Sequence, residues 1–439
     1  MCKRLVITIF VMLMGICGCG SQLSDMTGEM TFQNTMESEL ASSEDSTAVK
    51  TEDASKQEEG KDETIPTEQT NQELPRVEPK RTMEEIYELI AEKQYPLAIH
   101  SLSRMEDPEA RALEDKLRYI VSGDFWVVDE KGGFIAALDQ NQKVQVAHMN
   151  VIRFDDFRWE EDIRQWEKVS HIMPYSYRGI LGIQEDGGLL VGRDEYGVRL
   201  DKEIRSALLR AQNVKQVLCT SEEMCFVNAD GRVTGFLGYA SPASFFDNLE
   251  DVIKVVGWEG RLFALLRNGT IRLYGRGLGE KYEEAESWTD IVDIDAGGGY
   301  LVALRADGTV LCTNGRLNNF FEYNLHDWND LISVKVDELH LIGLKRDGTV
   351  CALQCVRVLR GDRYENMESE KIGDMSEWKN VVAVDVARCH FAALTADGRV
   401  LVSDYKTPDD QVYVTHVAPV VHHEIDTSVF HDLYIPTVK

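Results

Sequence analysis

Basic residues are scarce in this chain. Its 439 residues include 47 Lys and Arg against 75 Asp and Glu, which gives a formal net charge of −28. Proteins that bind nucleic acid neutralise phosphates with clusters of Lys and Arg, so this composition argues against nucleic acid as a partner. The same charge disfavours anionic lipid surfaces, and any membrane attachment must therefore come from a group other than a basic patch.

Motifs for catalysis and cofactor binding are also missing. The sequence contains no G-x-S-x-G, no H-E-x-x-H, no Walker loop and no calcium loop of the EF-hand type. His422, His423 and His431 lie close together in the sequence, but we interpret them as a solvated cluster rather than a metal site. We expect no catalytic residue, no bound metal and no cofactor.

The apolar run at the beginning of the chain is too short to cross a membrane, for which about 20 residues are needed. It follows Lys3 and Arg4 and leads into small residues, as in an export signal. The residues "ICGC", 16–19, resemble a bacterial lipobox. This resemblance implies a signal peptide over residues 1–18, lipid attachment at Cys19, and a location on the extracytoplasmic face of the cell membrane. A plain secretory signal or an uncleaved anchor is the alternative.

Large apolar residues are few between positions 19 and 81, where Ser, Thr, Gln and Glu dominate. Such a segment cannot bury enough surface to offset its ordering entropy, so we predict a disordered acidic linker that follows the lipid anchor. Over residues 82–122 the apolar spacing becomes helical. Thr82 with Glu85 forms a capping box, and Asp107-Pro108 is typical of a helix start. Part of this segment loosely resembles one tetratricopeptide repeat, but we interpret it as a small helical subdomain that caps the next domain.

A strand–turn–strand unit recurs through the rest of the chain. In "YLVALRADGTVLCTNG", 300–315, apolar residues alternate on both sides of Asp307-Gly308, which is a strong hairpin signal. The unit repeats with turn glycines at Gly187, Gly231, Gly269, Gly308, Gly348 and Gly398, and a weaker first copy turns at Gly132. We count seven copies.

A second landmark precedes each turn by about twenty residues. Trp288, Trp328 and Trp378 stand twenty positions before their glycines, Trp166 stands twenty-one before, and Leu249 and Ala211 take the same place in two other units. Each unit therefore has a leading strand after the Trp position, then the hairpin, then a variable stretch that could hold a fourth strand. Units of roughly 40 to 50 residues with several strands are typical of a propeller.

These residues resemble the RCC1-like (regulator of chromosome condensation) repeat family. The pattern W-x-[DN]-[VIL]-[VI]-x-[VI], followed by A-L-x-x-D-G-x-V, is clearest over 288–310, 328–350 and 378–400. The position before the second strand, often His in this family, holds His340, His390 and Tyr300 in three copies. The resemblance implies an all-β, seven-bladed propeller over residues 123–439. A strand at 411–421 could complete blade one and close the ring.

The resemblance and the export signal together favour a bacterial surface lipoprotein whose propeller binds a protein or glycan without catalysis, as a monomer. The alternative is a propeller enzyme, a hydrolase or lyase, that acts on an envelope or extracellular substrate. Exposed aromatic residues on the rim are the expected binding anchors, because such residues dominate binding energy. The candidates are Phe245, Phe246, Phe320, Phe321 and Trp258.

Overall fold

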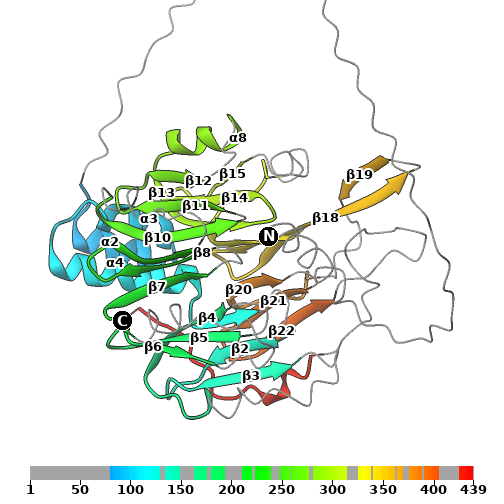
Figure 1. The fold of residues 1–439 in the computed structure, drawn as a ribbon, viewed down its shortest axis with the longest axis horizontal. Helices are drawn as coiled ribbons and strands as arrows, with labels where there is room; N and C mark the ends of the chain where they lie inside the picture. Colours follow the sequence, from blue (N-terminus) through cyan, green and yellow to red (C-terminus); the bar gives the residue numbers. More distant parts are fainter. Residues whose placement is uncertain are drawn as a thin grey trace, which may run out of the picture. The chain divides into compact units, whose positions relative to one another are not determined.

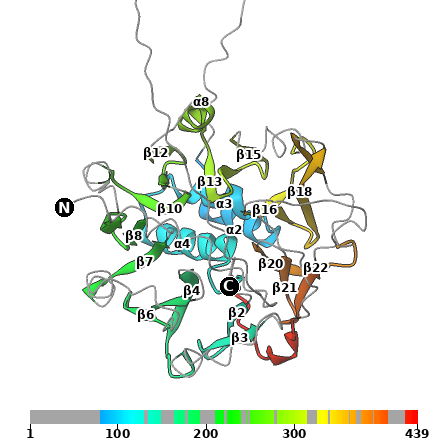
Figure 2. The same cartoon turned by 45° about the vertical axis from the view of Figure 1, so that its right-hand side comes forward.

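Seven small antiparallel sheets follow one another along the chain and stand around a common axis (Figure 2). The computed structural model describes residues 80–128, 134–148, 163–175, 179–192, 210–219, 223–238, 246, 249–258, 260–275, 280–313, 325–337, 340–360, 363–368, 375–387, 390–404 and 425–438. The predicted fold class, a seven-bladed β-propeller preceded by helices, is confirmed. The linker and the site at Cys19 lie outside the described residues.

Each blade takes its strands in chain order, with the leading strand at one edge. The strands are β1 (Trp126–Val128), β2 (Phe134–Leu138) and β3 (Val144–His148) in blade 1; β4 (Val169–Tyr175), β5 (Gly179–Gln184) and β6 (Leu189–Val191) in blade 2; β7 (Val214–Cys219), β8 (Glu223–Asn228) and β9 (Val233–Gly238) in blade 3; β10 (Val252–Trp258), β11 (Arg261–Leu266) and β12 (Ile271–Gly275) in blade 4; β13 (Ile291–Gly297), β14 (Tyr300–Arg305) and β15 (Val310–Cys312) in blade 5; β16 (Leu331–Val336), β17 (His340–Lys345), β18 (Val350–Arg360) and β19 (Arg363–Glu368) in blade 6; and β20 (Val381–Ala387), β21 (His390–Thr395) and β22 (Val400–Asp404) in blade 7. Among the described residues, a fourth strand occurs in blade 6, where β18 and β19 extend away from the other sheets (Figure 1).

Each blade begins on the hairpin turn of the blade before it. The carbonyl oxygen of the turn glycine accepts a hydrogen bond of 3.0–3.2 Å from the first residue of the next leading strand at five junctions: Val214 to Gly187, Val252 to Gly231, Ile291 to Gly269, Leu331 to Gly308 and Val381 to Gly348. The turn glycine has a left-handed φ of 78° at Gly187, and a Cβ there would lie 2.6 Å from the Cα of Asn213. The close approach therefore requires glycine as strongly as the turn does.

The Trp position fills the space over a small residue of the second strand. A Cβ on Gly182 would lie 2.9 Å from the ring of Trp166, and one on Gly343 would lie 3.0 Å from the ring of Trp328. Blade 3 has a small residue, Ala211, at the Trp position and a large one, Phe226, at the position that corresponds to Gly182. Both side chains belong to one apolar cluster. The twenty-residue offset thus preserves a volume rather than a particular side chain.

Blade 1 departs from the sequence-based prediction. Gly132 lies between β1 and β2, outside the described residues, so it is not the equivalent of the repeated turn glycines. The equivalent hairpin joins β2 to β3 over 139–143, and Gln142 takes the left-handed conformation there with φ 59°. Its carbonyl oxygen accepts the hydrogen bond from Val169 that a turn glycine accepts elsewhere. The prediction was wrong because this turn has no Asp-Gly pair.

Residues 425–438, which we call the closing segment, attach to blade 1. Asp139 pairs with Leu433 as an isolated antiparallel bridge, and the main chain of Tyr434 donates to the carbonyl of Leu138. The side chain of Gln145 exchanges two hydrogen bonds with the main chain of His431. The predicted strand at 411–421 lies outside the described residues.

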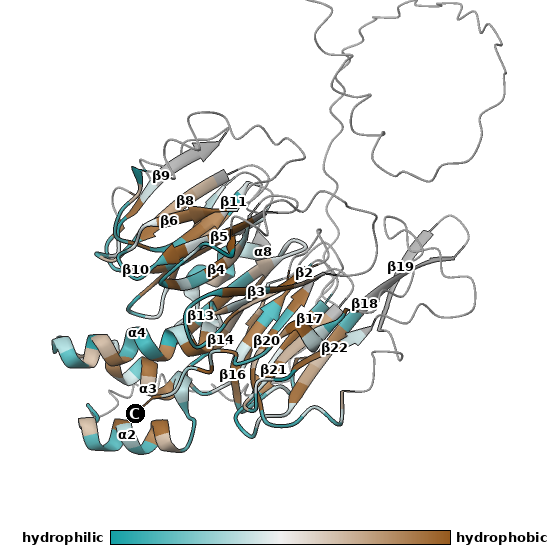
Figure 3. Ribbon diagram, turned by 90° about the horizontal axis from the view of Figure 1, so that it is seen from below, coloured by the Kyte–Doolittle hydropathy of each residue, from teal (hydrophilic) through white to brown (hydrophobic). Residues whose placement is uncertain are grey.

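Three helices precede the first blade: α2 (Met83–Ala91), α3 (Tyr95–Leu102) and α4 (Pro108–Ser122). The capping box of Thr82 with Glu85 and the Asp107 cap of α4 are present as predicted. Figure 3 shows the three helices together on one side of the sheets. We call them the helical cap. No helix in the described part of the chain is both long enough and apolar enough to cross a membrane.

Candidate functional site

The helical cap covers the end of the propeller that carries the repeated Asp-Gly or Asn-Gly turns. Apolar residues of all three helices share one buried cluster with blades 5 and 6, in which Leu117 and Val121 lie beside Val334. Ser333 donates a 2.7 Å hydrogen bond to the carbonyl of Val121, and Tyr119 donates one of 2.6 Å to the carbonyl of Ser170. The helices are therefore packed as core against this end of the blades.

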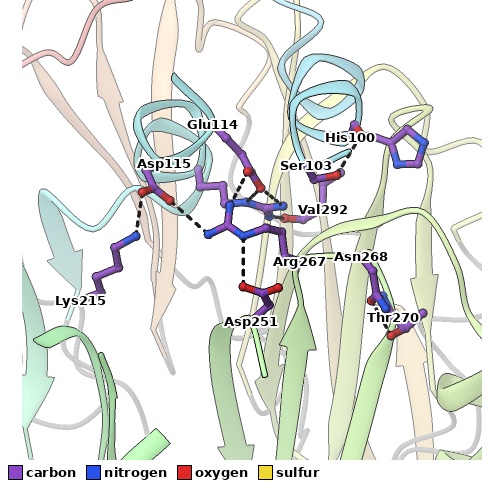
Figure 4. A network of polar contacts seen from close by, with 11 residues as sticks. His100, Ser103, Glu114, Asp115, Lys215, Asp251, Arg267, Asn268, Thr270 and Val292 are labelled. Carbon is purple, nitrogen blue, oxygen red and sulfur yellow. Dashed lines mark hydrogen bonds and ion pairs between the residues drawn. The ribbon is translucent and has the colours of Figure 1, made fainter. Parts of the chain in front are cut away.

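A buried ionic network joins α4 to blades 3, 4 and 5 (Figure 4). Glu114 is fully buried, and its two carboxylate oxygens meet the guanidinium groups of Arg118 and Arg267. Arg118 also donates to the carbonyl of Val292, at 2.6 Å. The neighbouring Asp115 pairs with Lys215 at 2.8 Å, but both of these side chains are more than a third exposed. The Glu114 carboxylate thus pairs with two arginines and, through Arg267, links α4 to the turn of blade 4.

A second set of charges lies inside the propeller. Lys254 pairs with Asp293 at 2.9 Å, with both side chains largely buried. Burial alone would lower the pKa of Lys335, but Asp295, Asp385, Asp124 and Asp293 together raise it above its usual value. The lysine thus stays charged and serves as the common counter-ion for carboxylates of blades 5 and 7.

These carboxylates also connect blades. Asp295 of blade 5 accepts a 2.8 Å hydrogen bond from the main chain of Val336 in blade 6. Asp385 of blade 7 accepts one of the same length from Val128 in blade 1, and so joins the last blade to the first. Gln216 makes the corresponding contact to Val255 with both ends of its amide. A polar side chain on the leading strand thus holds the next blade at three junctions.

These charged residues were not among the predicted site residues, although they share a position in the repeat. Asp295, Lys335 and Asp385 each stand seven residues after the Trp of their own repeat. Ionisable residues recurring at one position of a mostly apolar strand indicate a shared buried function. The partner of each charge could not have been read from the repeat, because it comes from another blade.

His340, at the end of blade 6 opposite the helical cap, was the residue that best suited the enzyme alternative. It is 1% exposed, with Nδ1 2.9 Å from the carboxylate of Asp337 and Nε2 3.0 Å from the amide nitrogen of Gln354. The carboxylate requires the proton on Nδ1, so Nε2 accepts from Gln354. A general base needs a nitrogen directed at substrate, whereas both nitrogens here are engaged within the blade.

The aromatic candidates have different outcomes. Phe246 is 1% exposed and packs in the apolar core of blades 3 and 4, beside the ring of Tyr274, so its prediction as a surface anchor was wrong. Trp258 is half-buried at the last position of β10. Phe245, Phe320 and Phe321 lie outside the described residues. Among the described residues, no group of three or more His, Cys, Asp or Glu is arranged to hold a metal.

No family model matches the chain, and neither does any curated protein. Among solved structures it is similar to the CRINKLY WD40 ectodomain of the Arabidopsis thaliana receptor kinase ACR4, with 11% identity over 64% of this chain and 94% of that one and a TM-score of 0.37. It is also similar to yeast RCC1 (Prp20), crystallised bound to Kap60, with 12% identity over 63% and 68% and a TM-score of 0.31. BamB from Moraxella catarrhalis shows 12% identity over 65% and 83%, with a TM-score of 0.32. Identities of this size concern the fold alone, and at these TM-scores the propeller assignment rests on the seven sheets.

Glu114→Gln should strongly destabilise the protein, because it removes the fully buried carboxylate that pairs with both Arg118 and Arg267 and leaves Arg267 only its longer contacts to Asp115 and Asp251. Breaking a buried ion pair by removing one partner costs about 3–5 kcal/mol. The matched control is Asp115→Asn on the same helix, which loses a partly exposed pair with Lys215 and a longer contact of 3.8 Å with Arg267, and should cost about 1 kcal/mol or less. Urea unfolding of both variants measures the difference, and equal costs would contradict a special role for Glu114.

Asp385→Asn should change the pH dependence of stability. Burial raises the pKa of Asp385 to about 6, although Lys335 and the amides of Val128 and Val386 oppose this, with Asp295 a further raising influence. A raised folded-state pKa gives stability that is complete at acidic pH and is lost as pH rises through about 6. Asparagine can still accept the Val128 hydrogen bond but carries no charge. Relative to wild type, the variant should therefore be more stable at about pH 7.5 than at about pH 4.5.

Asp347→Asn supplies a control of opposite sign. Hydrogen bonds from Thr349 hold the pKa of the Asp347 carboxyl below its ordinary value. Its contribution to stability is therefore present at neutral pH and is lost as pH falls through the lowered pKa. Urea unfolding at about pH 7.5, 4.5 and 2.5 compares the variants, and the Asp347→Asn effect should change only below about pH 4. An Asp385→Asn effect that does not vary between about pH 4.5 and about pH 7.5 would refute the predicted titration.

Proposed function

We propose that the chain is a non-catalytic binding protein that holds a protein or glycan partner at the end of the propeller opposite the helical cap. The observation that carries this proposal is the difference between the two ends of the blades. At the capped end, the turns between second and third strands are nearly repeated: QEDG, NADG, LRNG, RADG, KRDG and TADG. At the other end, the turns between first and second strands have little in common: WEGR, GGGY, DELH and ARCH in blades 4 to 7.

The repeated turns are fixed by structure. Five of their six glycines accept a hydrogen bond from the next blade. The turn of blade 4 also carries Arg267, which binds Glu114 of the helical cap. The variable turns share no sequence pattern, and among their described residues the contacts differ from turn to turn, as with Gly297 beside Asp337 and Gly299 bonded to Tyr282. A surface built from independently variable turns on a rigid frame suits recognition. The binding function follows from this surface and not from the fold, which serves many functions.

We further propose that the protein is a lipoprotein of the extracytoplasmic face of the cell membrane. The support is the sequence of residues 1–19, where a short apolar run precedes the lipobox-like "ICGC". Several acyl chains at Cys19 would give stable anchoring, since a single chain binds only marginally. The acidic stretch that follows, residues 20–81, would then set the reach of the propeller from the membrane.

A capture experiment tests the binding function. The whole chain is immobilised and exposed to surface extract and culture medium, beside one bait with Phe320→Ala and Phe321→Ala and one with Trp258→Ala. A fourth bait carries Asn329→Ala and Lys379→Ala, two exposed positions at the capped end. A partner retained by wild type and the capped-end bait, but lost by a rim bait of unchanged melting temperature, supports the proposal. Extract components that are chemically altered rather than retained would favour the enzyme alternative instead.

Anchoring is tested by Cys19→Ser. The variant should move from the membrane fraction to the soluble fraction and lose the mass of the acyl chains, as mass spectrometry of the intact protein can show. Cys17→Ser is the matched control and should remain lipidated in the membrane fraction. A Cys19→Ser protein that stays in the membrane fraction would instead indicate an uncleaved anchor.

A further inference from the structure

We propose that Trp258 and Arg261, supported by Tyr282, bind the carboxylate of an acidic side chain on a partner protein. This inference rests on the proposed binding function and names a site for it, at the end of blade 4 away from the helical cap. The evidence is the placement of these three side chains and the hydrogen-bond donors that they leave without an acceptor.

Trp258 and Arg261 face each other across a two-residue turn. They are paired in register as the last residue of β10 and the first of β11, so their side chains lie on the same face of the blade. On the third strand, Arg261 is paired with Gly275, where a Cβ would lie 2.8 Å from the Cα of Arg261. The third strand therefore contributes no side chain to this row, and the main chain can approach the arginine closely.

Tyr282 of α8 (Glu280–Glu283) lies beneath the arginine. The guanidinium carbon is 5.4 Å from the centre of the tyrosine ring, within the range of a cation–π contact. The ring is itself fixed, since its hydroxyl donates to the carbonyl of Gly299 in blade 5 and it packs 5.7 Å from the ring of Phe263. The aromatic support thus places the guanidinium group without using any of its N–H donors.

Donors of both side chains have no acceptor among the residues that the structure describes. Trp258 Nε1 and Arg261 Nε are buried without a hydrogen bond, and Arg261 forms no ion pair with any residue that the structure describes. The chain has an excess of carboxylates, and Arg118, Arg267 and Lys254 each pair with one. Buried polar groups in native proteins are nearly always paired, and the described residues supply no acceptor here, so we assign the acceptor to a bound partner.

The equivalent position in blade 6 shows what a structural role there requires. His340 starts the second strand of its blade as Arg261 does, and its ring is satisfied on both sides by Asp337 and Gln354. Blade 4 has the same main-chain arrangement, but a long cation stands there and no acceptor accompanies it in the described residues.

The donor set fits a carboxylate. A guanidinium group presents a planar fork of N–H donors that matches the two oxygens of a carboxylate, and an indole N–H can add a further bond. Trp, Tyr and Arg are also the residues most enriched at the energetic centres of protein–protein interfaces. These two facts favour an Asp or Glu side chain of a protein over the uronic acid of a glycan.

The test observes the two donors directly. In a ¹⁵N correlation spectrum of the whole deuterated chain, Trp258→Phe identifies the indole N–H and Arg261→Lys identifies the guanidinium Nε–H. The probe is a capped Gly-Glu-Gly tripeptide, with capped Gly-Gln-Gly as its uncharged match and glucuronate as the glycan arm. We expect the glutamate probe to shift both signals saturably and the glutamine probe to leave them unchanged.

Variants then assign the effect. Arg261→Gln should abolish the response and Arg261→Lys should weaken it, because an ammonium group lacks the planar fork. Trp258→Phe keeps the aromatic ring and should weaken binding about tenfold through loss of one hydrogen bond to a charged group. Trp258→Phe also tests the site if Arg261→Gln does not fold. Arg272→Gln is the control, since that guanidinium donates to the carbonyl of Ile271 and should not matter.

Three results would overturn the proposal: no shift with the glutamate probe, equal shifts with the glutamine probe, or a response to glucuronate alone. If the two N–H signals remain unshifted although the wild-type bait retains a partner that the Phe320→Ala, Phe321→Ala bait loses, that result would refute this site and leave the proposed binding function in place. If no bait retains a partner, the binding function itself fails.

Discussion

The propeller depends on one short main-chain contact, repeated around the ring. The first N–H of a leading strand donates to the carbonyl of the preceding turn glycine, as Val214 does to Gly187 and Ile291 to Gly269. The residue before that N–H has a left-handed φ at six junctions, at Lys168, Asn213, Asp251, Asp290, Asp330 and Asn380. A register shift follows directly afterwards in each of these blades. Turn, left-handed residue and bulge form one unit, and it fixes the distance at which the next blade stands.

The contact between blade 7 and blade 1 differs from the contact between the other neighbouring blades. A Cβ on Gly398 would meet nothing within 4 Å, so the last turn does not carry a following strand as the other turns do. The side chain of Asp385 makes the connection to Val128 instead, with Lys335 as counter-ion. A carboxylate of raised pKa thus connects two blades where the repeating main-chain contact is missing.

The repeat pattern was sufficient to predict the fold, because the sequence spacing reflects local geometry. The Trp-to-glycine offset spans one leading strand and one hairpin, and an Asp-Gly pair is typical of the type I′ hairpin turn. The hairpin turn of blade 1 was predicted at the wrong residues, because its left-handed residue is Gln142 and no Asp-Gly pair marks the turn. Phe246 was misjudged because the Phe pair was assumed to lie on a strand, whereas Phe246 is helical and packs in the core of blades 3 and 4. Arg118 with Glu114 is an ordinary i,i+4 pair in sequence, and only the approach of Arg267 makes it a buried network. The donors of Trp258 and Arg261 could not be predicted, because a missing acceptor is visible only when all neighbours are placed.

The closing segment imposes an order of events on biosynthesis. Gln145 in blade 1 is bonded to His431, 286 positions later, and Leu138 to Tyr434. Chains are synthesised from the amino end, so blade 1 is present long before the residues that complete it. During that interval β3 lacks these partners and the ring cannot shut, whereas blades 2 to 6 can each dock on a finished predecessor. Completion of the chain and maturation of the propeller are thereby coupled, because this slow, non-local step must wait until residues 431–434 are available.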